Sequence, residues 1–300
     1  MSFRLATNSV GSSRENSEEK QPLPKLFFVA EGAETEIIYL NEFKIKYSDK
    51  LLGELIIFNK IDISRSNQLF IVKNIDNFLH AAINMDEEIL NKIGDIKEDI
   101  LTTSDISNEK LNEKIDLIND LSSQVSNNPL FQDFQLLTKE NSLEFLNALV
   151  ELQGFEVGYD KVIIIIDRDK QSFKPYQYDE VISIAQKSGL LLGITNPCFE
   201  LFLLLHLKSP VSLDLQKIQE NKRYSRSKKS KKYVEHILNE AMKEIGDSYK
   251  KSQYNANILI DNFETLAVNA SSDLIAKNII DVKETIGTTL YEVLKPYIKN

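Results

Sequence analysis

Residues 161 to 169 read KVIIIIDRD, and this stretch decides the fold. The apolar, β-branched run from Val162 to Ile166 predicts a short strand that is covered on both faces. Such strands are typical of a parallel sheet with helices on either side. Asp167 and Asp169 follow at once, so the strand ends in two carboxylates separated by Arg168.

The segments on both sides of this strand alternate between strand and helix patterns. Three further apolar runs predict strands, at Leu26 to Ala30, Glu54 to Lys60 and Leu190 to Thr195. Helical periodicity follows them, from Glu34, from Asn67 to Ala82, from Tyr178 to Ser188 and from Asn196 to Leu207. This alternation predicts an α/β fold with a parallel sheet, flanking helices and right-handed crossovers.

Composition divides the chain into a tail, a main domain and a C-terminal region. Residues 1 to 24 are polar, and we expect them to be disordered. Residues 25 to 210 are expected to form the catalytic domain, with an acidic helical insertion at about 84 to 150. Residues 211 to 300 are predicted to be helical and contain a basic segment at 222 to 232.

Charge and hydropathy exclude several classes of protein. The net charge of −9 gives the chain as a whole no general affinity for nucleic acid, so any contact needs a local patch. Its apolar runs are far shorter than the roughly 20 residues that cross a bilayer, and no apolar signal segment is present. A single cysteine, Cys198, excludes an internal disulfide. We therefore expect a cytoplasmic protein without membrane contact.

Carboxylates follow two of the predicted strands. Glu31 comes directly after Ala30, and Asp167 and Asp169 end the central strand. The carboxyl ends of parallel strands face a common crevice, and Mg²⁺ prefers oxygen ligands, so these acids predict a metal site. Gly32 would allow a tight turn after Glu31. The alternative, that the aspartates cap the next element and Glu31 lies in a turn, is equally consistent with the motifs alone.

Three motifs in order resemble the Toprim-like family, and its RloB and AbiL groups in particular. They are EGAETE at 31 to 36, IIIIDRD at 163 to 169 and NPCFELFLLLH at 196 to 206. The resemblance covers about Lys25 to Leu207 without the insertion. It implies a Toprim-like, Rossmannoid fold and a nuclease that cuts DNA or RNA with Mg²⁺ or Mn²⁺.

The resemblance also implies roles for residues and partners. Glu31 would be a metal ligand or general acid/base, and Asp167 and Asp169 would bind the metal. Gln171 stands where many relatives carry a third acid, which leaves one- and two-metal chemistry open. The proteins of this family typically act in prokaryotic phage defence beside a partner ATPase, and a homo-oligomer is compatible with this.

Several other charged residues are candidates for the same site. Glu200 lies in the first turn of an apolar helix and is expected in the active site, or else in a dipole or ion-pair role. Glu34 and Glu36 are expected mainly as dipole-favourable surface acids, although the spacing of Glu36 recurs in the family. Arg168 and Lys170 are candidate phosphate contacts.

The segment KRYSRSKKSKK, residues 222 to 232, contains seven basic residues and no acid. We predict that it binds the nucleic-acid backbone and that Tyr224 and Tyr233 stack on bases. The alternatives are a solvated loop or a docking site for an acidic partner. The predicted contacts are Lys222, Arg223, Arg226, Lys228, Lys229, Lys231 and Lys232.

The histidines and the cysteine form no motif. His206 is expected in the core or at its rim, His80 and His236 on the surface, and Cys198 in the interior. Two rival functions remain open. One is a phosphatase or nucleotidyltransferase that uses Asp167, and the other is a non-catalytic scaffold or sensor subunit.

Overall fold

The computed structural model describes residues 23–32, 34–58, 67–103, 106–123, 155–227 and 230–299, together with residues 143, 147 and 152. The expected N-terminal tail lies outside the described residues except for its last two positions. Most of the expected insertion beyond residue 123 also lies outside them.

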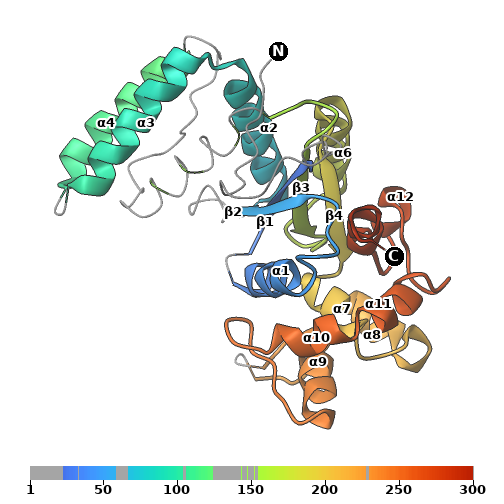
Figure 1. Ribbon diagram of the computed structural model, residues 1–300. Coiled ribbons are helices and arrows are strands. Elements are labelled where there is room, and N and C mark those ends of the chain that lie inside the picture. The colour runs from blue at the N-terminus through green and yellow to red at the C-terminus, as the bar shows by residue number, and fades with distance from the viewer. Residues whose placement is uncertain are drawn as a thin grey trace, which may run out of the picture.

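Within the described residues, five strands form one sheet in the order β2-β1-β3-β4-β5, as Figure 1 shows in part. The first four are parallel, which confirms the predicted α/β sheet. The short β5 runs antiparallel to β4, where Thr288 pairs with Thr195. The expectation of an all-helical C-terminal region was therefore wrong at β5. A strand of two residues is too short to show a periodic pattern in the sequence. The strands are β1 Lys25–Ala30, β2 Glu54–Phe58, β3 Lys161–Asp167, β4 Leu191–Asn196 and β5 Gly287–Thr288.

The sheet separates two apolar cores. Along β1, Phe27 and Val29 enter the first core while Leu26 and Phe28 enter the second, because successive side chains point to opposite faces. Helices α2 (Gln68–Asn84) and α6 (Pro175–Ser188) belong to the first face. Helices α1 (Thr35–Lys46) and α7 (Phe199–Leu204) belong to the second.

The described part of the insertion is a pair of helices, α3 (Glu87–Thr102) and α4 (Asn108–Ser123), which stand side by side and project from the sheet (Figure 1). Isoleucines at a spacing of three or four residues bury one face of α3. Asp86 caps its start by accepting a hydrogen bond from the Ile89 amide at 2.8 Å. This confirms the predicted helical insertion within the described residues.

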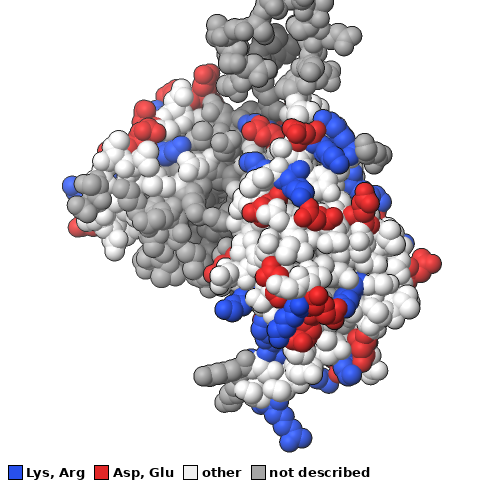
Figure 2. All heavy atoms as spheres, turned by 60° about the horizontal axis from the view of Figure 1, so that its bottom comes forward, with Lys and Arg blue, Asp and Glu red and all other residues white. Residues whose placement is uncertain are grey.

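Most of the C-terminal region packs on the same face as α1 and α7 and shares their core, whereas Val282 belongs to the core that α2 and α6 cover. In particular, α10 packs against α1. Figure 2 looks onto this side of the molecule, where Lys and Arg are scattered among Asp and Glu. Its elements are η2 Pro210–Ser212, α8 Leu215–Glu220, α9 Tyr233–Glu244, α10 Ala256–Asp261, α11 Phe263–Ala270, α12 Ile279–Val282, α13 Leu290–Leu294 and η3 Lys295–Tyr297.

The strand order places a topological switch point between β1 and β3. The chain passes from β1 to β2 on one side and later enters β3 on the other. Open α/β sheets bind ligands beyond the carboxyl ends of the strands at this point. In the described part of the chain, no helix is both long and apolar enough to span a bilayer.

Candidate active site

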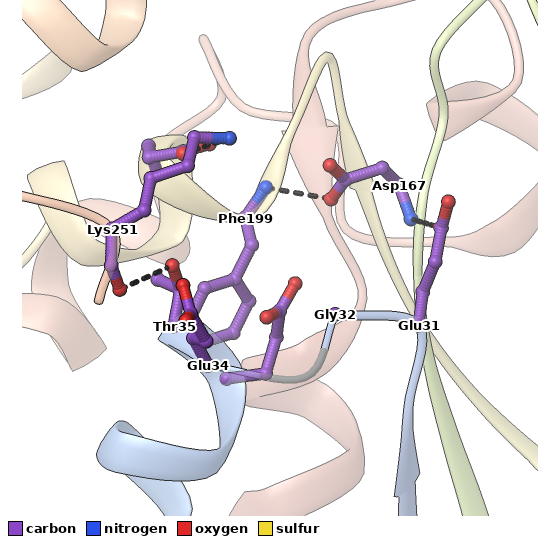
Figure 3. Close-up of a pocket in the computed structure, with 9 residues that line it drawn as sticks. Glu31, Gly32, Glu34, Thr35, Asp167, Phe199 and Lys251 are labelled. Atoms are coloured by element: carbon purple, nitrogen blue, oxygen red, sulfur yellow. Dashed lines mark hydrogen bonds and ion pairs between the residues drawn. The ribbon is translucent and has the colours of Figure 1, made fainter. Parts of the chain in front are cut away.

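A pocket of about 370 Å³ opens at the carboxyl ends of β1 and β3. In Figure 3, Glu31 and Asp167 lie on one side of it, with Thr35 and Lys251 on the other. The segments that form it come from the end of β1, the start of α1, the end of β3, the start of α7 and the loop before α10. The lining residues are Glu31, Gly32, Glu34, Thr35, Glu36, Asp167, Phe199, Glu200 and Lys251.

Two hydrogen bonds hold the Glu31 carboxylate beside Asp167. The Asp167 amide donates to Oε2 at 2.9 Å, and Gln68 Nε2 donates to Oε1 at 2.9 Å. Gln68 is buried at the start of α2, and its own Oε1 has no hydrogen-bond partner within the described part of the chain. The prediction that Glu31 and Asp167 meet at one edge of the sheet is confirmed.

The Asp167 side chain connects the end of β3 to the start of α7. Its Oδ1 accepts a hydrogen bond from the Phe199 amide at 2.7 Å. Burial raises the pKa of Asp167 well above its usual value, and the nearby Glu31, Glu36 and Glu200 carboxylates raise it further. The hydrogen bond from Phe199 opposes this shift without cancelling it. Asp167 therefore lies where an added positive charge would be strongly stabilising.

Glu36 also belongs to the pocket, although the sequence favoured a surface role for it. The residue is buried, and its carboxylate occupies the space beside Gly32, where a Cβ on Gly32 would overlap Glu36 Oε2. Burial raises the Glu36 pKa to about 7, and Glu200 and Glu31 add to the shift. The family spacing of Gly32, Thr35 and Glu36 was the signal for this position. Its physical basis is that glycine leaves room for the folded-back carboxylate.

Glu200 is buried at the first turn of α7 and pairs with Lys251. Lys251 Nζ lies 2.9 Å from Glu200 Oε1, and the Tyr249 hydroxyl donates to the same oxygen at 3.3 Å. Burial alone would raise the pKa of Glu200, but Lys251 and the hydrogen bonds lower it below its usual value. The ion pair considered from the sequence is therefore present, and it forms part of the pocket wall.

Asp169 does not lie in the pocket. Its Oδ1 accepts a hydrogen bond from the Gln171 amide at 2.9 Å, and its Oδ2 lies 3.5 Å from Lys232 Nζ. The strand ends at Asp167 and the chain turns away, so the two aspartates do not share a face. Asp169 thus has the turn-capping geometry that the sequence left open as an alternative.

The two candidate phosphate contacts after β3 are engaged elsewhere. Arg168 is 1% exposed, donates to the carbonyls of Lys283 and Phe173 and stacks over Phe173 and Tyr178. The expectation that Arg168 contacts substrate was wrong, because the side chain points into the core beside α6. Lys170 is exposed and binds Glu284 through both the carbonyl at 2.8 Å and Oε2 at 3.1 Å.

The basic segment lies near the pocket but is partly neutralised. Lys231 Nζ donates to the Tyr249 carbonyl at 2.8 Å, and Lys232 pairs with Asp169. Lys222 pairs with Glu220 at 3.0 Å, while Arg223 donates to the Ser230 carbonyl at 2.7 Å. Arg226 is exposed, and Lys228 and Lys229 lie outside the described residues. The prediction that this segment binds nucleic acid stays a prediction.

Side chains expected outside the site are found there, with one difference. His206 is fully buried between the Tyr39 hydroxyl and the Phe202 carbonyl, each at 3.0 Å, which confirms a core histidine. Cys198 is buried and His80 is exposed, also as expected. His236 is only half-buried, because it stacks on Tyr224 at a ring distance of 3.6 Å. Tyr224 thus already has an aromatic partner, and half-buried Tyr233 lies beneath Lys217.

The chemistry of the pocket fits a hard divalent cation. Its acidic side chains offer only oxygen donors. Burial, and then the crowding of carboxylates, raises the pKa of Asp167 and Glu36. Among the described residues, no three His, Cys, Asp or Glu side chains already converge as ligands of one ion. Mg²⁺ commonly takes one or two carboxylates and retains several waters, so Glu31 and Asp167 would supply enough protein ligands for such an ion.

Sequence reasoning missed polar side chains that line or support the pocket. Thr35 and Lys251 line it, and Gln68 supports it by donating to Glu31. Gln68 is a single polar residue at the start of a predicted helix. Thr35 donates through its hydroxyl to the Lys251 carbonyl at 2.9 Å, across 216 positions of sequence. Nothing in the local pattern identifies such residues, because each acts through a partner that only the folded chain brings near.

One family model matches this chain. The model of the RloB-like protein family matches residues 26–296, which include both strand ends, α7 and the C-terminal region that supplies Lys251. No curated protein and no solved structure matches the chain. The chain therefore belongs to the RloB-like protein family.

Proposed function

We propose that this chain is a divalent-metal-dependent nuclease that hydrolyses phosphodiester bonds of DNA or RNA in the carboxylate pocket. The observation that carries the proposal is the meeting of Glu31 and Asp167 at the switch point of the sheet. Glu36 and Glu200 line the same cavity. Crowded buried carboxylates oppose one another, so a site of this kind is typical of function rather than of stability.

The pocket residues have distinct chemical roles in this proposal. Glu31 and Asp167 would hold Mg²⁺ or Mn²⁺, which supplies a positive charge to neutralise the phosphate during attack. Glu36 is suited to take the proton of the attacking water and return it to the leaving oxygen, because it is buried in the same cavity as Glu31 and Asp167. Gln68 and the Asp167 amide keep the Glu31 carboxylate oriented.

Membership of the RloB-like family supports a finer proposal about context. We infer that the chain is the effector subunit of a prokaryotic anti-phage or abortive-infection system and works with a partner ATPase in the cytoplasm. Co-purification with the product of a neighbouring ATPase gene tests this. Recovery of the chain alone, under conditions that preserve such complexes, would contradict the proposed association with an ATPase.

Cleavage by purified protein tests the nuclease proposal directly. Mixed single- and double-stranded DNA and transfer RNA are incubated with Mg²⁺ or Mn²⁺. Asp167→Asn and Glu31→Gln are each expected to lower the cleavage rate by about 10²-fold or more. Asp169→Asn is the matched control, because it lies two positions away and outside the pocket. Activity that survives in both pocket variants refutes the site.

A non-catalytic scaffold is the second candidate. The observation that favours it is the lack of a preassembled three-ligand metal group among the described residues. Calorimetric titration with Mg²⁺ and Mn²⁺ separates the two functions, with and without nucleic acid. Binding that Asp167→Asn abolishes supports the nuclease. No binding under either condition supports the scaffold.

A further inference from the structure

Lys251 is the one basic side chain among the described residues that line the pocket. It comes from the loop between α9 and α10, 51 positions after Glu200 and beyond the expected catalytic domain. Five acidic side chains line the same cavity, which by itself would repel the anionic backbone of a nucleic acid. Lys251 is placed to oppose that repulsion.

The backbone of Lys251 is anchored to the start of α1. Its carbonyl accepts the hydrogen bond from the Thr35 hydroxyl, and the Tyr254 hydroxyl donates to the Thr35 carbonyl at 2.7 Å. The Gln253 amide donates to the Lys250 carbonyl at 2.9 Å, which closes the loop as a tight turn. The loop therefore presents Lys251 at a defined position over the pocket.

The ammonium group of Lys251 is paired on one side, but most of the side chain is exposed to solvent. Its Nζ pairs with Glu200, whose side chain is 4% exposed, yet the Lys251 side chain itself is 59% exposed. An ammonium group has three N–H donors, and Glu200 is its one side-chain partner within the described residues. Donors remain available to a ligand that enters the pocket.

We propose that Lys251 is a catalytic residue that donates a hydrogen bond to a non-bridging phosphate oxygen of the scissile phosphodiester. This inference rests on the proposed nuclease function and makes the active site composite, since the C-terminal region completes it. Glu200 then serves as a positioning residue that keeps the ammonium group at the pocket wall. A charge-assisted contact of this kind grows stronger as negative charge builds on the phosphate.

The test compares Lys251→Met with Lys250→Met in the full chain. Both changes keep an unbranched side chain and remove one charge, but Lys250 is an exposed neighbour that does not line the pocket. On a fluorescein-labelled oligonucleotide substrate with Mn²⁺, Lys251→Met is expected to lower kcat by about 10²-fold. Lys250→Met is expected to stay within about twofold of the unaltered protein. Mn²⁺ affinity, measured by calorimetry, is expected to be retained in both.

A double-mutant cycle with Glu200→Gln excludes a merely neutralising role. If Lys251 only balances the Glu200 charge, then Lys251→Met has no further effect once Glu200 is Gln, which overturns the proposal. If Lys251 contacts the phosphate, the loss of about 10²-fold persists on that background. The double variant removes both charges of the Glu200–Lys251 pair, so neither is left buried without its partner. It can therefore still be measured if one of the single variants fails to fold.

The outcomes distinguish this inference from the proposed function. If the unaltered protein cleaves its substrate and Lys251→Met changes the cleavage rate by less than about threefold, the role of Lys251 is overturned. The nuclease proposal then stands. Absence of cleavage by the unaltered protein, on every substrate and with both metals, overturns both. A loss of Mn²⁺ binding in Lys251→Met would make the residue part of the metal site and overturn its role as a phosphate contact.

Discussion

In the carboxylate pocket, Glu36 and Glu200 are 8% and 3% exposed, whereas in the basic segment Lys222, Arg223 and Arg226 lie on the surface. Both regions are clusters of like charge. Burial shifts the pKa values of the pocket acids, while in the basic segment several charges pair with surface acids or with carbonyls. The comparison indicates that buried like charges repel one another and favour binding of a ligand of opposite charge, whereas exposed like charges are largely screened by solvent and salt.

The largest expected effect is on the pH dependence of stability. The pKa of Glu36 is about 7 in the fold, whereas its ordinary value is 4.5. The contribution of Glu36 to the free energy of unfolding therefore falls as pH rises from 4.5 to 7. His206 acts oppositely, because burial lowers its pKa from 6.5 to about 4 and its contribution falls as pH drops through this range. Each shift corresponds to about 3 kcal/mol.

Glu36→Gln removes one of these opposing contributions. Measured by urea unfolding without metal, the variant is expected to gain up to about 3 kcal/mol over the unaltered protein at pH 7.5 and almost nothing at pH 4.5. The exposed neighbour Glu34→Gln is the matched control, with an expected change within about 0.5 kcal/mol at both pH values. A gain that does not depend on pH would contradict the burial argument.

The next largest effect concerns the hydrogen bond from Gln68 that orients the Glu31 carboxylate. Gln68→Leu removes the donor to Glu31 Oε1. It also removes the buried side-chain carbonyl, which has no hydrogen-bond partner among the residues that the structure describes. Mn²⁺ affinity is expected to fall by about 10- to 100-fold in calorimetry, because residues that orient a ligand contribute at this level. Asn67→Ala, which removes the cap of α2 but leaves this contact, controls for loosening of the helix. Equal losses in both variants would point to the helix rather than to the contact.

Gly32→Ala tests whether space beside the backbone places Glu36 in the pocket. The new methyl group would overlap the Glu36 carboxylate, which can rotate away because it is the end of a flexible side chain. We expect little loss of stability but about a tenfold loss of cleavage. Its unfolding free energy should then vary with pH as that of Glu36→Gln does. Retained activity together with the wild-type pH profile would show that Glu36 keeps its place.

The smallest effect is expected in the basic segment. Replacing Lys222 and Arg226 with Ala should lower the slope of log affinity against log salt by about 1, since each phosphate contact on single strands contributes roughly 0.7. Lys222 contributes less because Glu220 already pairs with it. Fluorescence anisotropy with a labelled oligonucleotide measures the slope. An unchanged slope would assign the segment to a solvated loop or a protein partner.

The strands were predictable because each buried parallel strand is a continuous apolar run bounded by polar residues, as in Lys161–Asp167. The positions of Glu31 and Asp167 were predictable too, since a strand end fixes where the next residue lies. The position of Asp169 was not, because the strand ends at Asp167 and a turn begins at Asp169. Arg168 shows the same limit, with a side chain that enters the core instead of reaching a substrate.

By itself, the sequence determined the parallel sheet, its helical layers and the edge where two acids meet, because these depend on local patterns of apolar and polar residues. Only the tertiary structure decided which other charges join them. Gln68, Glu36, Glu200 and Lys251 reach Glu31 and Asp167 from separate elements, and loops with no periodic pattern fix how those elements pack. The balance of charge in the pocket is therefore a property of the folded chain.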